Sequence, residues 1–428
     1  MILVVVGIFV VTYALLIFRS FGKRKIPAWI SMVVGSLLMV ATLSISPLEA
    51  FRSIDLRVIS FLFGILVITS GFEKSGLIEY LILSILKRSK SFDRLFLGII
   101  FGAGLLAAFL VNDGIALLIT PIALGICSRL GLTPRSILIP VAFGITTGSA
   151  FTPIGTPQNL LVALNSGMTD PFGKFALYLL APSLISLFAV YFLSKSFFRS
   201  DYSSARDFKT MKESLKRPSD AITDSSLAKL SGMALVLLLI SFIVVEAFPE
   251  LQSFGFTFGN LALAFGIGIL ILSPKRILLV KGINWGILIF FAGMFVVMRA
   301  LWDSTVGSAI LSILPKPTQS SGLQSTGAIM VNSVLLSQIL SNVPFVQLYT
   351  YEMHALAFTS SSTTQWLSLA AGSTLAGNLT FLGAVSNVII LTSAEERREK
   401  AFTFFEFLKY GSVVTLVTCL IFVLFLAV

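Results

Sequence analysis

The sequence predicts an all-α polytopic membrane protein made of two inverted-topology repeats, each with a re-entrant hairpin and a broken transmembrane helix. Composition is the first observation. Of 428 residues, 56% are hydrophobic and only 12% are charged, and the mean hydropathy is +0.95. Soluble domains carry roughly 25% charged residues, and disordered chains are poor in apolar ones. A soluble globular protein and a disordered protein are therefore both excluded. The other two observations, apolar spans flanked by charges and an internal repeat, predict the number and order of the membrane segments.

Basic residues mark one side of the membrane. The chain has 31 Lys and Arg against 20 Asp and Glu, a net charge of +11. The positive-inside rule accounts for this excess without a nucleic-acid partner. Basic clusters occupy alternate loops, so we expect residues 199–229 and 394–401 in the cytoplasm and both termini outside. The first span has its start outside and its basic flank (Arg19, Lys23, Arg24 and Lys25) inside.

Cysteine and histidine usage limits the chemistry. Cys127 and Cys419 lie in apolar runs, and His354 is the single histidine. The chain therefore has no disulfide framework, no metal-ligand spacing and no zinc-hydrolase motif. An intramembrane enzyme would also need an acid–base pair at depth, and Asp113 is the one charged residue of the stretch 95–128. We expect neither enzymatic activity nor an organic cofactor.

The first repeat is predicted over residues 1–198. Between its apolar spans, the stretch 95–128 has basic flanks on both sides and one charge inside it, Asp113. Two helices of about 16 residues would reach about 24 Å and return, so we expect a re-entrant hairpin with its tip at Val111–Gly114. In about 136–165, Pro153 and Pro157 predict a broken helix. The spans cover residues 1–18, 27–46, 58–71 and 175–194.

A polar cytoplasmic linker, residues 199–229, leads to the second repeat, residues 230–428. We expect its hairpin at about 324–353, entering from outside with its tip at Ser341–Pro344, and its broken helix at about 365–393. The remaining spans cover residues 230–245, 256–272, 284–299 and 402–428.

Matching motifs establish the duplication. Asn112 and Asn342, each at a break in an apolar stretch, stand 230 positions apart. The pattern Thr152-x-x-Gly155-x-x-x-Asn159 recurs 228 positions later as Thr380-x-x-Gly383-x-x-x-Asn387. Two halves with breaks in the same places are typical of duplicated transporters. Because the first span runs inward and its counterpart after the linker runs outward, the repeats are expected to be inverted.

The four breaks predict a site near the membrane midplane, because free backbone groups in hydrocarbon are tolerated only where they are buried in protein or line a cavity. Asp113 is the strongest candidate: a carboxylate at that depth suggests a group that couples transport to Na⁺ or H⁺, and its alternative role is a structural helix cap. The asparagines either bind the solute or satisfy free backbone groups. The candidate binding residues are Asn112, Asp113, Gly114, Thr152, Gly155, Thr156, Asn159, Ser341, Asn342, Thr380, Gly383, Ser386 and Asn387, with a candidate Na⁺ site near Asn112, Asp113 and Asn159.

These motifs resemble the ion transporter superfamily. Val111–Gly114 followed by Thr120-Pro121-Ile122 is similar to the hairpin tip of arsenite permeases. The segments Thr152–Asn159 and Ser337–Pro344 are similar to the bacterial anion permease branch, which is related to divalent anion–sodium symporters and citrate transporters. The resemblance implies two inverted repeats with Asn112 and Asn342 at the hairpin tips, Gly155, Asn159, Gly383 and Asn387 on the facing broken helices, and a homodimer as a common assembly.

The chain departs from the symporter pattern at both tips. Asp113 and Val343-Pro344 stand where the symporters carry Ser-Asn-Thr, and an acidic tip suits proton coupling, or a neutral or cationic species, better than a dianion. The leading hypothesis is a secondary active transporter of a small anion, an inorganic oxyanion or a carboxylate, coupled to H⁺ or Na⁺. Arsenite or antimonite efflux and sodium–proton antiport are the alternatives within that class, and a passive channel is the alternative outside it. The expected location is a bacterial or archaeal inner membrane, with membrane lipid as the surrounding partner.

Overall fold

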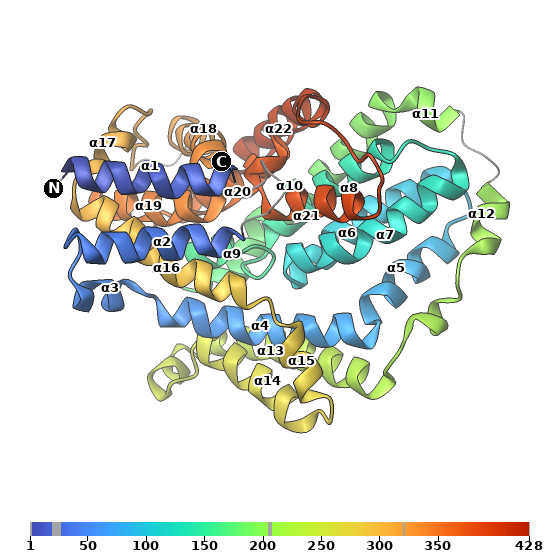
Figure 1. Ribbon diagram of the computed structural model, residues 1–428, viewed down its shortest axis with the longest axis horizontal. Helices are drawn as coiled ribbons and strands as arrows, with labels where there is room; N and C mark the ends of the chain where they lie inside the picture. The colour runs from blue at the N-terminus through green and yellow to red at the C-terminus, as the bar shows by residue number, and fades with distance from the viewer. Residues whose placement is uncertain (1, 19–26, 204–207, 320–321, 428) are drawn as a thin grey trace.

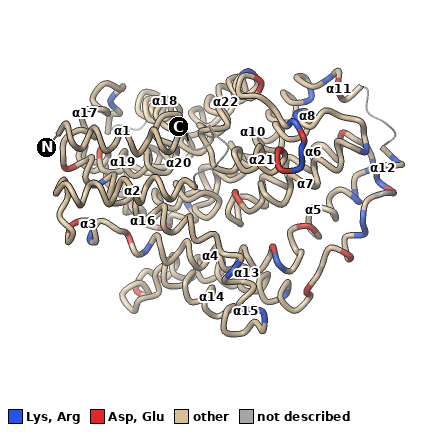
Figure 2. Tube along the Cα trace, viewed as in Figure 1, with Lys and Arg blue, Asp and Glu red and all other residues tan. Residues whose placement is uncertain are grey.

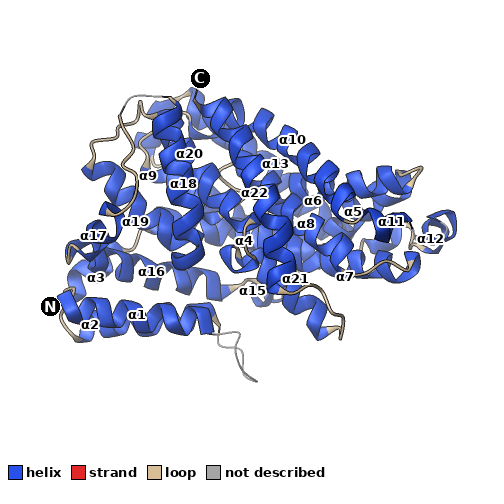
Figure 3. Ribbon diagram, turned by 90° about the horizontal axis from the view of Figure 1, so that it is seen from above, coloured by secondary structure: helices blue, strands red, loops and turns tan. Residues whose placement is uncertain are grey.

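The computed structural model describes residues 2–18, 27–203, 208–319 and 322–427. These residues form helices joined by loops, with no strand among them (Figures 1 and 3). Eight of the described helices are long and apolar enough to cross a membrane. The predicted multi-pass, all-α class is confirmed. The basic residues Arg19, Lys23, Arg24 and Lys25 lie outside the described residues.

The helices of the two halves correspond in order, and most pairs begin 228–233 positions apart. The pairs are α1 (Ile2–Phe18) with α13 (Ser225–Ala247), α2 (Ala28–Ala41) with α14 (Phe258–Leu272), α3 (Pro47–Ser53) with α15 (Arg276–Gly282), α4 (Leu56–Ser75) with α16 (Trp285–Asp303), α5 (Leu77–Arg88) with α17 (Val306–Ser312), α6 (Phe92–Phe109) with α18 (Leu323–Leu340), α7 (Asn112–Leu130) with α19 (Asn342–Ala355), α8 (Arg135–Gly148) with α20 (Thr363–Leu375), α9 (Pro157–Asn165) with α21 (Val385–Glu396), and α10 (Pro171–Phe197) with α22 (Phe404–Leu426).

The halves exchange packing partners. Helix α4 packs on α14 while α16 packs on α2, and α7 packs on α21 while α19 packs on α9. In Figure 1, α13, α14 and α15 lie along the lower edge of the molecule, next to α4. This reciprocal pattern fits an internal repeat. The inverted orientation of the repeats and the domain limits drawn from the sequence stay predictions.

The contact between α4 and α14 is a backbone contact. A Cβ atom at Gly64 would lie 1.9 Å from the carbonyl oxygen of Ala262, and one at Gly266 would lie 2.8 Å from the Cα of Gly64. Small residues that let helix backbones approach are typical of membrane helix pairs. These glycines therefore fix how closely the first repeat approaches the second.

Both predicted hairpins bend at the predicted tips. Helix α6 ends at Phe109 and α7 begins at Asn112, after two residues with extended backbone. In the second repeat, the single residue Ser341 separates α18 from α19, with φ 64° and ψ 156°. Helices α6 and α7 have 18 and 19 residues, longer than the expected 16 or so, and are about 27 and 29 Å long. Since these lengths are close to the roughly 30 Å of a bilayer core, re-entry without crossing stays a prediction.

The linker packs along the ends of the first-repeat helices. It contains α11 (Arg199–Ser203), α12 (Phe208–Ser214) and a 3₁₀ turn, Pro218–Ala221. Lys87 donates to the carbonyl of Lys212 at 2.9 Å, and Lys212 donates to the carbonyl of Ser89 at 2.8 Å. Figure 2 shows charged residues along this linker and at helix ends, with mostly uncharged residues in the helix bodies between them.

Candidate functional site

A central cavity of about 270 Å³ lies where both hairpin tips and both broken helices meet. Helices α2 and α16 supply its other wall, with Trp29 and Phe290 among the apolar residues. Segments separated by more than 270 positions therefore share one cavity. The remaining lining residues include Asn112, Asp113, Pro157, Gln158, Asn284, Ser341, Asn342, Val343, Gly383, Ala384 and Val385.

The first tip contributes an amide and a carboxyl group. Asn112 is buried, and its side-chain amide donates to the hydroxyl of Ser386 in α21 at 3.5 Å. Asp113 is half-buried, lines the cavity and lies in the first turn of α7, where the helix dipole favours an anion. A Cβ atom at the next residue, Gly114, would lie 3.1 Å from the methyl group of Thr69 in α4. The tip thus presents a carboxyl group beside the start of a helix.

The second tip contributes an acceptor. Asn342 is 4% exposed and lines the cavity, and its Oδ1 atom has no hydrogen-bond partner among the described residues. Ser341 adopts a positive φ that residues with side chains rarely take. A strained residue directly before a buried amide is typical of a binding site, since such strain persists only where surrounding structure imposes it.

At the first break, Asn159 holds the unwound backbone together. Its amide nitrogen donates to the carbonyls of Ser149, Ala150 and Thr152 at 3.2, 3.1 and 3.0 Å, and its oxygen accepts from Thr374 Oγ1 at 2.9 Å. Asn159 is fully buried and does not line the cavity. Its hydrogen bonds are those of a brace for backbone groups that the break leaves free.

Neighbouring predicted residues take similar supporting positions. The Thr152 hydroxyl donates to the Ala108 carbonyl and accepts from the Gly155 amide at 3.0 Å. Thr156 caps α9 by accepting from the Asn159 amide at 3.3 Å. A Cβ atom at Gly155 would lie 2.4 Å from the Ser149 carbonyl oxygen, so glycine is required there. None of these three lines the cavity.

The second break is held differently. Asn387 donates to the Gly377 carbonyl at 2.6 Å, and its Oδ1 atom has no partner in the described part of the chain. Thr380 donates to Gln338 Oε1 at 2.7 Å, and Gln338 Nε2 donates to the Ala376 carbonyl at 2.9 Å. Asn387 and Thr380 stand behind the cavity, whereas Gly383 lines it.

Three polar residues were missed by the sequence analysis. Gln158 and Asn284 line the cavity, and Gln338 supports the second break. Gln158 is 4% exposed and its amide donates to Thr374 Oγ1 at 3.3 Å. The internal repeat could have predicted Gln158, because Gln158 corresponds to Ser386, a candidate binding residue 228 positions later in the second half.

The charge of the cavity is simple. Asp113 is the one charged residue in its described lining, which includes neither Lys nor Arg. No group of three His, Cys, Asp or Glu side chains that could hold a metal ion occurs among the described residues. A carboxyl group surrounded by amides and a hydroxyl can hold a proton or a monovalent cation. The described lining has no positively charged side chain that could pair with a dianion.

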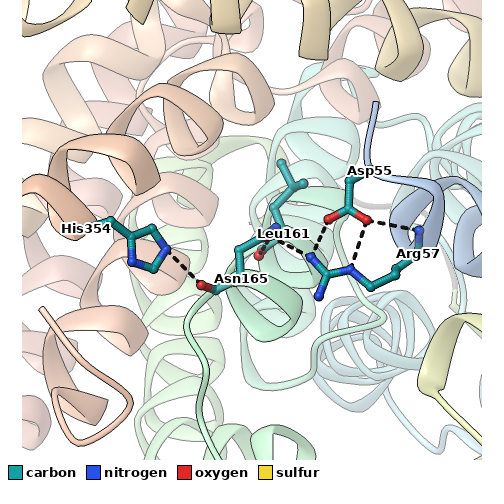
Figure 4. Close-up of polar contacts among 5 residues, drawn as sticks. All are labelled: Asp55, Arg57, Leu161, Asn165 and His354. Atoms are coloured by element: carbon teal, nitrogen blue, oxygen red, sulfur yellow. Dashed lines mark hydrogen bonds and ion pairs between the residues drawn. The ribbon is translucent and has the colours of Figure 1, made fainter. Parts of the chain in front are cut away.

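A second cavity, about 660 Å³, lies between the start of α4, the end of α16 and α19. Beside it, Arg57 pairs with Asp55 at 2.8 Å and donates to Asn165 Oδ1 at 3.1 Å (Figure 4). His354 Nε2 lies 3.0 Å from the Asn165 carbonyl oxygen. This network ties the starts and ends of α4, α9 and α19 together. At the repeat-related position of Arg57 stands Gly286, which lines the central cavity.

Comparison with known proteins places the chain in a family. The family model described as citrate transporter, CitMHS, matches residues 13–375. The chain belongs to the citrate transporter family. This confirms the resemblance to the ion transporter superfamily seen in the hairpin and broken-helix motifs. Because the family and the relatives are transporters, the protein is a membrane transporter and not an enzyme.

Relatives cover nearly the whole chain. A transporter of Mycobacterium bovis, Mb2703, is 29% identical over 430 residues, covering 97% of this chain and 95% of its own. The silicon efflux transporter LSI3 of rice, Oryza sativa subsp. japonica, is 26% identical over 458 residues, covering 96% and 94%. This member of the citrate transporter family therefore aligns end to end with proteins named for transport.

Solved structures show the same fold. The Neisseria gonorrhoeae protein MtrF, described with a class of antimetabolite efflux pumps, superposes with a TM-score of 0.58 at 13% identity, covering 99% of this chain and 94% of MtrF. The Alcanivorax borkumensis transporter YdaH gives 0.54 at 14% identity, covering 99% and 97%. At these identities the likeness concerns architecture alone.

Proposed function

We propose that this citrate transporter family protein is a secondary active transporter that moves a small oxygen-rich solute through the central cavity, with Asp113 coupling that movement to H⁺ or Na⁺. One observation carries the proposal: both hairpin tips and both broken helices supply the cavity lining, and its charged member is a carboxyl group. Half-helices that meet at one site are the arrangement expected for alternating access.

The solute is proposed to be an inorganic oxyacid or a carboxylate bound in a state of low charge. A carboxyl group in the lining repels an anion unless a proton or Na⁺ neutralises one of the two. Amide groups of Asn112 and Gln158 can donate to solute oxygens, and Asn342 Oδ1 can accept from solute hydroxyls. The relative named for silicon efflux supports this class, because dissolved silicon is chiefly an uncharged, fully hydroxylated acid near neutral pH.

Hydroxylated metalloid acids such as arsenite have the same chemistry and remain the second candidate within this proposal. Sodium–proton antiport would use Asp113 alone and would give the side-chain amides of Asn112, Gln158 and Asn342 no solute to bind. A passive channel would need a continuous polar lining. Most of the cavity wall is apolar, with Ala28, Trp29, Ile287, Phe290 and Phe291, which favours a closed binding site over a pore.

The test is coupled uptake into proteoliposomes. Silicic acid, arsenite and citrate are offered under an imposed pH or Na⁺ gradient. With one coupling ion per solute, a tenfold gradient, worth about 1.4 kcal/mol, accumulates the solute up to about tenfold. We expect Asp113→Asn to reduce accumulation to a ratio of about one while solute exchange continues, because Asn keeps the shape and loses the charge.

Asp303→Asn is the matched control, since Asp303 is an acid at the end of α16 that pairs with Arg299 at 2.7 Å and does not line the cavity. It should accumulate solute like the wild type. Undiminished, ion-driven accumulation by Asp113→Asn would remove Asp113 from the coupling step and leave it the role of a helix cap.

A further inference from the structure

A third cavity, about 810 Å³, lies away from the central site between α6, α10 and α13. Its walls are largely apolar, and the unwound segment Thr152–Ile154 forms part of its floor. Several wall residues are open on their outer side: Ile243 is 64% exposed, and Leu105 and Leu180 are each 38% exposed. In a multi-pass protein, apolar side chains exposed on spanning helices face the bilayer. The cavity is thus a groove that opens toward lipid.

Two carboxyl groups stand at one end of this groove. Asp170 caps α10 by accepting from the Gly173 amide at 3.0 Å, and Glu246 accepts from the Phe172 amide at 2.7 Å. The two carboxyl groups therefore accept from the amides of consecutive residues and meet at the first turn of α10. Ionised carboxylates only accept hydrogen bonds, so the pair offers its remaining oxygen lone pairs to a donor. A cation with N–H donors could contact both groups.

No described basic side chain already fills this role in the groove. Its lining contains neither Lys nor Arg. Lys174, the basic residue next along α10, directs its ammonium group to the Thr169 hydroxyl at 3.4 Å. The acidic end of the groove therefore complements a cationic group that comes from outside the chain.

The dimensions fit one bilayer leaflet. Asp170 directly precedes α10 and Glu246 lies in the last turn of α13, so the pair sits at the ends of two candidate spans, where headgroups lie. From Glu246 the groove follows α13 to Leu239, and along α10 it reaches Leu180. These stretches are about 10 and 14 Å long, close to half of a hydrocarbon core of roughly 30 Å.

We propose that this groove binds one phospholipid whose headgroup carries a primary ammonium, with the ammonium on the Asp170–Glu246 pair and one acyl chain between α6, α10 and α13. The apolar walls and the opening toward the bilayer select a lipid over a soluble amine. The carboxyl pair selects an ammonium headgroup over an anionic one. The bound chain would touch both α13 and the unwound segment of the first broken helix.

Competition between two lipids tests the proposal. The full-length protein in detergent is mixed with equal amounts of dioleoyl-phosphatidylethanolamine and dioleoyl-phosphatidylglycerol, and the first retained lipid is identified by native mass spectrometry. We expect the wild type to retain the ethanolamine lipid about tenfold more often, and Asp170→Asn/Glu246→Gln to retain the two lipids about equally. Both replacements are conservative, because Asn caps helices and tolerates the positive φ of Asp170, and Gln keeps an acceptor for Phe172.

Two further variants separate groove binding from general lipid adhesion. Ala176→Trp fills the groove and should lower retention of both lipids, whereas Leu177→Trp, at a neighbouring residue outside the groove that is 76% exposed, should not. Glu250→Gln, an acid beyond the end of α13, should keep the wild-type preference. Equal retention of both lipids by the wild type, or an unchanged preference in the double variant, would overturn the proposal. Transport activity does not enter the readout, so the outcome is independent of the solute.

Discussion

The two repeat-related asparagines Asn159 and Asn387 should differ strongly in their contribution to stability. Each is fully buried at a helix break, at matching positions of the two halves. Asn159 bonds to three backbone carbonyls and to Thr374, whereas Asn387 bonds to the carbonyl of Gly377. Replacing each by Ala removes the same atoms from a similar setting, so their difference isolates the hydrogen bonds.

The expected magnitude follows from counting protons. An amide has two N–H donors, so the three carbonyls share two donated bonds, and the bond accepted from Thr374 makes three. At about 1 kcal/mol each, Asn159→Ala should lower the free energy of unfolding by about 3 kcal/mol. Asn387→Ala loses one bond, about 1 kcal/mol. The difference of about 2 kcal/mol is roughly 30-fold in the ratio of folded to unfolded protein.

Unfolding by SDS in mixed micelles, followed by tryptophan fluorescence, measures both variants against the wild type. An equal loss of unfolding free energy in the two variants, or a larger loss for Asn387→Ala, would refute the reasoning. The additional hydrogen bonds of Asn159 would then contribute nothing to stability. A normal solute affinity in the folded fraction of Asn159→Ala is also expected, since Asn159 does not line the cavity.

Three further predictions concern other positions. Ser341→Gly should stabilise the protein by about 1 kcal/mol in the same unfolding assay, because glycine adopts the φ of 64° without strain; a destabilised variant would contradict this. Arg57→Gln should lower the free energy of unfolding by less than about 1 kcal/mol in that assay, because the Arg57 side chain is 56% exposed and exposed ion pairs contribute little; a larger loss would contradict this. Asp224 accepts from the Leu227 amide and pairs with Lys275, which lowers its folded-state pKa below the unfolded value. Its charge therefore stabilises the protein above the unfolded pKa, and the deficit of Asp224→Asn seen at pH 7 should vanish as the pH falls through the folded pKa; a deficit independent of pH would argue against it.

Sequence reasoning located the breaks and left the direction of side chains open. Proline residues and span lengths act locally, so the tips at Asn112 and Asn342 and the unwound stretch before Pro157 could be predicted. Which of two adjacent residues faces the cavity could not. Gln158 lines the cavity, whereas Asn159 donates to backbone carbonyls. Consecutive residues of a helix face directions about 100° apart, and only the packing of the helix decides which of them faces the cavity.

Contacts between distant polar residues were equally hidden. Asn165 contacts Arg57, 108 positions away in the sequence, and His354, 189 positions away. No local sequence pattern predicts such a network. The carboxyl pair of Asp170 and Glu246 was equally hard to predict, since it depends on how the start of α10 meets the end of α13.

The backbone contact between Gly64 and Ala262 has a consequence for biosynthesis. The surface of α4 around Gly64 is shaped for α14, which is translated about 200 residues later. At roughly 5–20 residues per second, α4 spends about 10–40 s in the membrane before its partner is made. During that interval lipid or the insertion machinery must cover its glycine face, and the first half of the chain reaches its final packing only after the second half has been inserted.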